Sequence, residues 1–171
     1  MATMPVQVRA VLPSDAADVA RILNGIIAAG AYTVLDTEVS SDDERRFIES
    51  FPPRGIFHVA VAAGGTVVGF QNVEPFATFT RAFDHVGVIG TFVDLESRRS
   101  GIGRQLFAAT FAEARRRGFR KLVAYVRADN PGALAAYLAH GFRVVGTARA
   151  QALINGRYVD ETFIERTLLP G

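Results

Sequence analysis

The sequence predicts a mixed α/β (α+β) fold in which a central sheet of about seven strands is flanked by about four helices. In the first half of the chain, successive strand patterns are joined by a Gly64-Gly65 turn, which is typical of an antiparallel meander. In the second half, strands alternate with helices, which is typical of βαβ units. The sheet should therefore contain both antiparallel and parallel pairs. At 171 residues, we expect one domain, residues 1–171.

The first half begins with an alternating, valine-rich strand at residues 6–12. A helix should start at Ser14 and end at Gly30, with an apolar stripe formed by Val19, Ile22, Leu23, Ile26 and Ile27. Residues 41–44 have capping-box spacing and predict a short helix that Pro52 stops. The hairpin strands are residues 57–63 and 66–73, and an irregular, aromatic-rich segment at 74–86 follows them.

The second half continues with a strand, a helix and a buried strand at residues 87–95, 101–117 and 121–126. Asn130 should cap the next helix, Pro131 should be its first residue, and Gly141 should close it. Residues 142–148 and a last strand ending near residue 168 are separated by an Asn155-Gly156 turn. The predicted order is β-α-α-β-β-β-α-β-α-β-β.

Composition excludes several functional classes. The chain has no cysteine, which rules out disulfides and a thiolate nucleophile, and its three histidines are scattered without ligand spacing, so we expect no metal. The net charge is only +2, and the run of arginines at 115–117 reads as an exposed helix end, so we expect no nucleic-acid partner. No apolar run approaches membrane-spanning length and no signal peptide is evident, which predicts no membrane partner and a cytoplasmic location.

The most informative stretch is a strand, a loop and a helix start at residues 91–106. Free N–H groups and the helix dipole attract anions at such a start, and glycines let an anion approach the backbone. The loop and first turn hold Arg98, Arg99, Ser100, Gly101, Ile102, Gly103 and Arg104. The alternative is ordinary capping with two incidental glycines. A Walker loop and a dinucleotide fingerprint are both excluded, because Arg104 and Leu106 stand where those motifs need lysine and glycine.

A second group lies on the predicted helix after Asn130. Seven residues return a helix to nearly the same azimuth, so Asn130 and Tyr137 should share a face about 10 Å apart. A tyrosine hydroxyl opposite a thioester can protonate a departing thiolate. The alternatives are a buried aromatic for Tyr137 and a simple N-cap for Asn130.

Together, these stretches resemble the GNAT superfamily of N-acetyltransferases. The run from Arg98 to Gly103 is similar to its Q/R-x-x-G-x-G/A pyrophosphate loop, and Asn130…Tyr137…Gly141-Phe142 is similar to its second motif. The element order is also that of the GNAT fold, over nearly the whole chain. Residues 22–24, 141–142 and 156–160 most resemble the phosphinothricin and amino-acid N-acetyltransferase branch.

The resemblance implies specific roles. The strand edge at Thr91, Phe92 and Val93 would offer backbone groups to the pantetheine of acetyl-CoA, and residues 99–104 would wrap its pyrophosphate. Asn130 would bond the pantetheine arm or its thioester end, and Tyr137 would be the general acid. In such folds the two central strands splay apart around the co-substrate. The branch also implies a homodimer, formed through the C-terminal strands.

One departure concerns the general base. Branch members with assigned activity usually carry glutamate where this chain has Val88. An ammonium group must lose a proton before it attacks a thioester. Asp84, His85 and Glu74 border the region, and we take His85 as the candidate base because of its pKa.

The implied reaction is direct transfer of an acetyl group to a small primary amine, with an amino acid or analogue preferred as acceptor. The acceptor would bind over residues 74–85 and 31–37, against Tyr32, Glu74, Phe76, Arg81 and Asp84. The aromatic side chains there are equally typical of a hydrophobic floor or a dimer contact. Two other functions stay open: a non-catalytic CoA-binding or regulatory module, and an acetylase of protein N-termini.

Overall fold

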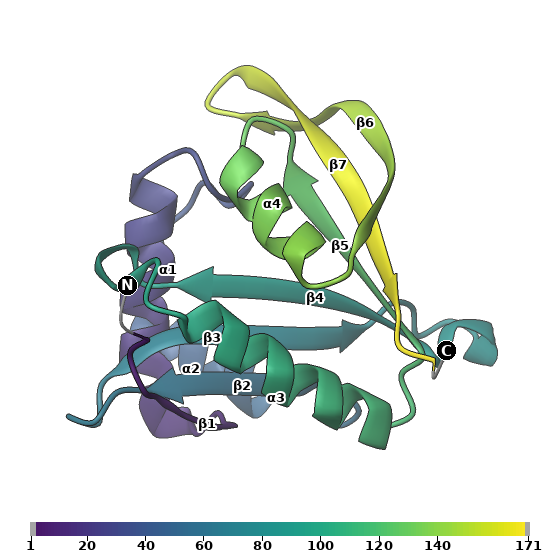
Figure 1. Ribbon diagram of the computed structural model, residues 1–171. Coiled ribbons are helices and arrows are strands. Elements are labelled where there is room, and N and C mark those ends of the chain that lie inside the picture. The colour runs from purple at the N-terminus through teal and green to yellow at the C-terminus, as the bar shows by residue number, and fades with distance from the viewer. Residues whose placement is uncertain (1–2, 170–171) are drawn as a thin grey trace.

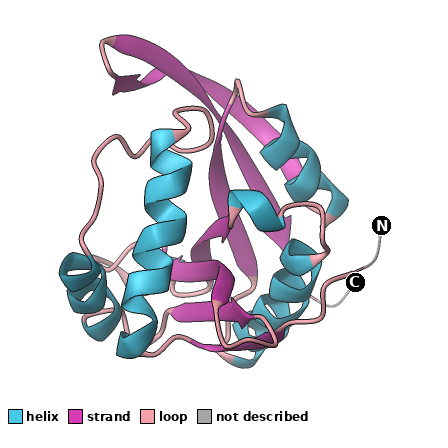
Figure 2. Cartoon of the chain, turned by 90° about the vertical axis from the view of Figure 1, so that its left-hand side faces the viewer, coloured by secondary structure: helices cyan, strands magenta, loops and turns pink. Residues whose placement is uncertain are grey.

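The computed structural model describes residues 3–169, which form one seven-stranded sheet with helices on both of its sides (Figures 1 and 2). The strand order is β1-β2-β3-β4-β5-β7-β6. The strands are β1 (Gln7–Ala10), β2 (Ile56–Val61), β3 (Val67–Pro75), β4 (Val86–Val93), β5 (Lys121–Arg127), β6 (Arg143–Ile154) and β7 (Arg157–Thr167). Among the strand pairs that the structure describes, only β4 and β5 are parallel, which confirms the predicted mixed sheet.

Residues 3–169 form four α-helices, which are α1 (Ala16–Ala28), α2 (Ser41–Glu49), α3 (Ile102–Arg116) and α4 (Pro131–Ala139). Short 3-10 turns at Pro13–Asp15, Arg81–Phe83 and Leu95–Ser97 lie between the main elements. The order of strands and helices is the predicted one. The cap of α2 differs by one residue, since Ser40 accepts from the Asp43 amide at 3.1 Å.

Two large apolar clusters hold the helices on the sheet, and a smaller third cluster packs the start of α3 against β2 and β3 in the described chain. Phe57 and Phe70 pack with α1 and α2 on one side, and Phe107 and Phe142 pack with α3, α4 and β5 on the other. Neighbouring residues of a strand point to opposite faces. In β3 and β4 each residue therefore faces either the α1/α2 side or the α3/α4 side, and this alternation determines which side chains can meet at the site.

Candidate active site

The two central strands separate along their length. β4 and β5 pair from Val86 opposite Lys121 to Val88 opposite Val123, and the described chain shows no further pair between them. Both strands continue beyond this point, so they diverge (Figure 1). Peptide groups on the open side of β4 therefore lack a strand partner and are available to bond a ligand.

A cavity of about 650 Å³, here called the larger cavity, lies between α3 and α4 at this divergence. Its size is within the range of small-molecule sites. Most residues predicted to bind the co-substrate line it: Thr91, Val93, Arg98, Arg99, Gly101, Ile102, Gly103, Arg104 and Asn130. Phe92 lines a second cavity instead, and the Ser100 hydroxyl is bonded within the loop to the Ser97 carbonyl.

The loop before α3 is suited to an anion. Gly101 caps the helix with a φ of 79°, a left-handed conformation that glycine adopts without strain. The N–H groups of the first turn have no intrahelical acceptor, and the dipole adds positive potential there. A Cβ built on Gly103 would meet no protein atom within 4 Å, so the backbone is open to close approach. With three arginines around it, this set of donors fits a diphosphate.

Asn130 performs the expected capping role, since its side chain accepts from the Ala133 amide at 3.1 Å. Its amide nitrogen also lies 3.5 Å from the Tyr32 carbonyl oxygen. Tyr32 in turn stacks under Arg98, whose guanidinium carbon lies 3.9 Å from the ring centroid. These contacts join the segment after α1 to both sides of the larger cavity.

Tyr137 lies on α4 and is 7% exposed. Its ring packs edge-on against Phe107 and Phe142, with centroids 5.4 and 5.0 Å away. The hydroxyl oxygen lies 2.9 Å from Oγ1 of Thr91 on β4. Burial raises the pKa of Tyr137 to about 12, and the hydrogen bond with Thr91 opposes that rise. The phenol therefore keeps its proton at neutral pH.

A second cavity of about 440 Å³, here called the smaller cavity, is reached from the other side of the divergence. It shares four lining residues with the larger cavity: Tyr32, Thr91, Ala133 and Tyr137. Two spaces for ligands therefore meet beside one buried phenol. A molecule in each cavity would bring its reacting atoms together at that junction.

Two carboxylates line the smaller cavity. Glu74 of β3 is paired directly opposite Val88 of β4, so their side chains share a face. Glu161 of β7 lies on the far wall, and burial raises the pKa of its carboxyl group. These groups give this cavity the means to hold an ammonium group or to accept its proton.

The cover of the smaller cavity is the segment 32–35, and one buried arginine holds it in place. Arg127 donates through Nη1 to the carbonyls of Gly30 and Thr33, at 3.1 and 3.0 Å. Its Nε and Nη2 donate to Asp129 at 2.9 and 2.8 Å. Asp129 holds the pKa of Arg127 above its usual value, so this guanidinium is a fixed cation with most of its donors in use.

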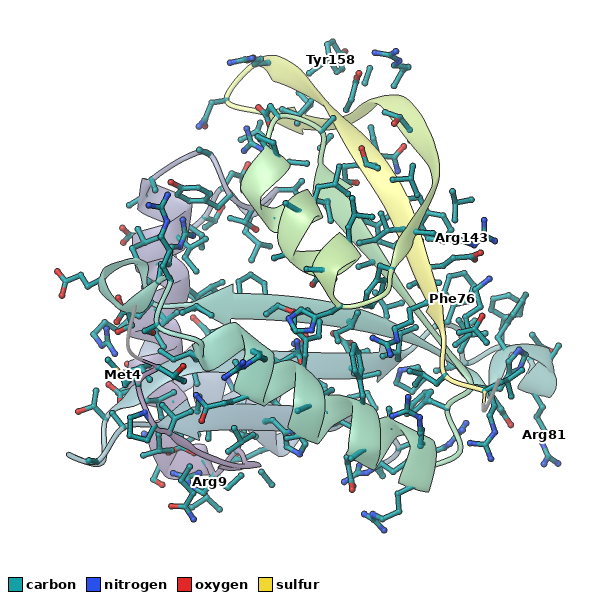
Figure 3. The ribbon with its side chains drawn as sticks, in the orientation of Figure 1. Met4, Arg9, Phe76, Arg81, Arg143 and Tyr158 are labelled. Atoms are coloured by element: carbon teal, nitrogen blue, oxygen red, sulfur yellow. The ribbon has the colours of Figure 1, made fainter. Side chains whose placement is uncertain are left out.

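Four residues predicted for the acceptor side line neither cavity: Phe76, Arg81, Asp84 and His85. His85 precedes Thr91 by six steps of about 3.3 Å along the extended chain, so it lies roughly 20 Å from the junction. Arg81 has a 97% exposed side chain that reaches Asp84 at 3.5 Å. Figure 3 shows Phe76 and Arg81 at the end of the molecule where β4 begins. The site proposed below uses Tyr32 and Glu74, and the roles predicted for these four residues stay predictions.

Three residues of the site were not anticipated from the sequence: Gln71, Arg127 and Glu161. Gln71 is a polar residue inside the apolar run 67–73, which is a signal for a buried functional amide. Arg127 and Glu161 gave no local signal, because they reach the smaller cavity only through the pairing of β5 with β7.

In the part of the chain that the structure describes, no group of three or more His, Cys, Asp or Glu side chains could hold a metal ion. None of the helices described is both long and apolar enough to cross a bilayer.

Comparison with known proteins gives consistent results. An L-methionine sulfoximine/L-methionine sulfone acetyltransferase of Pseudomonas paraeruginosa is 29% identical over 115 residues, which is 66% of this chain and 64% of that protein. This match thus spans less than two thirds of that relative. The L-amino acid N-acyltransferase MnaT of Escherichia coli is 25% identical over 155 residues, covering 91% of this chain and 90% of its own.

Among solved structures, a GNAT superfamily phosphinothricin acetyltransferase from Sinorhizobium meliloti, in complex with acetyl-CoA, superposes with a TM-score of 0.87. It is 22% identical and matches 96% of this chain and 89% of its own, which shows a shared fold. The sequence model of the acetyltransferase (GNAT) family matches residues 27–142, more than half of the chain. This protein belongs to the GNAT family of acetyltransferases.

Proposed function

We propose that this acetyltransferase moves the acetyl group of acetyl-CoA directly to the primary amine of a small molecule, an amino acid or an amino-acid analogue. One observation carries the proposal: a cavity that fits a diphosphate meets a second, smaller cavity at Tyr137. The names of the Pseudomonas and Escherichia coli relatives support the acceptor class. The smaller cavity, at about 440 Å³, suits a small molecule.

Each element of the site has a part in this reaction. The turn at Gly101 and Gly103 binds the diphosphate, and the open edge of β4 bonds the pantetheine. The acceptor amine enters the smaller cavity and attacks the thioester at the junction, where closeness and orientation supply much of the rate. Tyr137 gives its proton to the departing sulfur.

We propose Glu74 as the group that takes the proton from the acceptor ammonium, in place of His85. Glu74 is paired directly with Val88 across β3 and β4, so the two side chains lie on the same face of the sheet. Val88 is the position at which the resemblance to the branch predicts a glutamate. The base would thus stand one strand away from the expected position. Transfer through one water is compatible with its place in the cavity wall.

Glu74→Gln is expected to lower kcat/KM roughly tenfold at neutral pH, with recovery as the pH approaches the pKa of the acceptor amine. Recovery follows because a substrate that is already neutral needs no base. The measurement is a pH–rate profile for both proteins. Glu161→Gln provides the contrast: if that variant shows the pH-dependent loss and Glu74→Gln does not, the assignment of the base is wrong.

The function itself is tested by thiol release from acetyl-CoA across a panel of amino acids, their amides, polyamines and short peptides. We expect turnover with amino acids and intersecting rather than parallel initial-rate lines, since no covalent enzyme intermediate forms. Binding of CoA without turnover on any amine would favour a binding module. Turnover on peptides alone would favour an acetylase of protein N-termini.

We also infer a cytoplasmic homodimer that pairs through the C-terminal strands. Val144 and Val145 of β6 and Tyr158 of β7 are exposed there. Sedimentation equilibrium of the purified protein tests the dimer, and a monomer at micromolar concentration would contradict it.

A further inference from the structure

Three side chains from separate elements form a hydrogen-bonded line that ends at the junction of the two cavities. Nε2 of Gln71 donates to Oγ1 of Thr91 at 2.8 Å, and Oγ1 of Thr91 lies 2.9 Å from the Tyr137 hydroxyl. Gln71 and Thr91 are paired across β3 and β4, and Gln71 is fully buried. Such a line in a dry site has a preferred direction, because each hydrogen can be donated only once.

The direction follows from counting hydrogens. The amide nitrogen of Gln71 can only donate, so it occupies one lone pair of Thr91. If Thr91 then donates to Tyr137, its single hydrogen is used and the phenolic hydrogen is left to point into the cavities. If Tyr137 donated to Thr91 instead, the threonine hydrogen would have no acceptor in contact with it among these three residues, because the Gln71 atom that meets Oγ1 is the donor Nε2. With an acceptor atom at the junction, only the first arrangement gives both hydroxyl hydrogens an acceptor, whereas Oε1 of Gln71 is buried without a partner among the described residues in either arrangement.

We propose that Thr91, oriented by Gln71, is a positioning residue that donates to the Tyr137 oxygen and so aims the tyrosine proton at the departing sulfur. The inference rests on the proposed function, in which Tyr137 is the acid. In the step, the Tyr137 O–H bond breaks and an S–H bond forms. The phenolate left behind keeps the hydrogen bond from Thr91 until a proton returns from the ammonium side or from solvent.

Thr91 also makes the phenol a stronger acid. Burial places the pKa of Tyr137 far above that of a thiol, so proton transfer is uphill unless the phenolate is stabilised. A hydrogen bond donated to a charged oxygen is stronger than one to a neutral oxygen. Thr91 therefore stabilises the product of the transfer more than its starting state, which is the property that accelerates a step.

The decisive pair of variants is Thr91→Val and Thr91→Ser. Valine keeps the shape and the β4 backbone but has no hydroxyl, whereas serine keeps the hydroxyl. We expect Thr91→Val to lower kcat roughly tenfold with little change in the KM or Kd for acetyl-CoA, and Thr91→Ser to restore most of the rate. Tyrosine ionisation, followed by ultraviolet difference absorbance, should shift to higher pH in Thr91→Val.

Thr110→Val is the matched control. Thr110 is a fully buried threonine on α3, and its hydroxyl bonds His58 Nδ1 at 3.0 Å, away from both cavities. Thr110→Val replaces a hydroxyl by a methyl group, as Thr91→Val does, and it should lower the free energy of unfolding without altering kcat. An equal loss of kcat in Thr110→Val and Thr91→Val would show a general folding effect and overturn the proposal.

The role of Gln71 is tested by reversing its polarity. Gln71→Glu accepts a hydrogen bond from Thr91, which turns Thr91 into the acceptor for Tyr137 and directs the phenolic proton away from the sulfur. We expect it to lose more activity than Gln71→Met, which has the same length and no hydrogen bond. Equal rates for wild type and Gln71→Glu would overturn the stated direction. If Gln71→Glu does not fold, the two Thr91 variants decide the matter.

A double-mutant cycle separates this proposal from the function beneath it. If Thr91 acts through Tyr137, Thr91→Val should cost nothing further in a Tyr137→Phe background. Full activity of the single variant Tyr137→Phe would show that Tyr137 is not the general acid, and it would contradict the proton donor of the proposed function. Low activity of Tyr137→Phe together with full activity of Thr91→Val would contradict only the positioning role of Thr91.

Discussion

Tyr137→Phe is expected to lower kcat by about two orders of magnitude, because it removes the hydroxyl of the buried phenol at the junction of the two cavities. The ring should stay in place, since its contacts with Phe107 and Phe142 need no hydroxyl. The Kd for acetyl-CoA should therefore change by no more than about twofold. Thiol release gives kcat, and calorimetry gives the Kd.

The control for this variant is Tyr158→Phe. Tyr158 is 68% exposed on β7, so loss of its hydroxyl should leave both constants unchanged. An unchanged kcat in Tyr137→Phe would contradict the acid role. A large rise in the Kd for acetyl-CoA would show instead that the hydroxyl serves binding.

Gly103→Leu is expected to weaken acetyl-CoA binding about a hundredfold or more, through steric exclusion of the diphosphate from the first turn of α3. A Cβ at Gly103 would have open space around it, so we expect the folded chain to tolerate a side chain there, and leucine favours a helix more than glycine does. The variant should thus keep its thermal stability while losing its ligand. Calorimetry with CoA and a thermal melt without it measure the two effects.

Gly25→Leu is the matched control for Gly103→Leu. Gly25 lies within α1, has equally open space around it and lines neither cavity. It should bind CoA as the wild type does. Undiminished binding by Gly103→Leu would mean that the diphosphate does not lie over this turn.

The fold was predictable because its signals are local. Asn130 caps α4 through its own side chain, and Gly30 and Gly141 follow helices with φ of 68° and 81°. The length of β6 was underestimated. It runs to Ile154 because it pairs with β7 along most of its length, and a tertiary pairing of this kind leaves no trace in local periodicity.

The two halves of the site also differed in how well the sequence predicted them. The anion-binding loop is contiguous in sequence, so its residues could be identified together. The smaller cavity is assembled from β3, β4, β5, β7 and the segment after α1, and pairing register decides which side chains face it. Glu74 lines the cavity and His85 does not, because His85 precedes β4, at the end of that strand away from the junction.

Because β4 separates early from β5, the free energy of unfolding of this protein should depend on the concentration of the ligand that binds the open edge of β4. Other strands of the sheet bond their peptide groups to a neighbouring strand of the same chain, whereas the open edge of β4 leaves peptide groups to be bonded by a ligand that associates and dissociates. By mass action, a ligand bound only by the native state at a hundred times its Kd adds about 2.7 kcal/mol to the free energy of unfolding. The persistence of this molecule against heat and proteolysis thus varies with how much acetyl donor surrounds it.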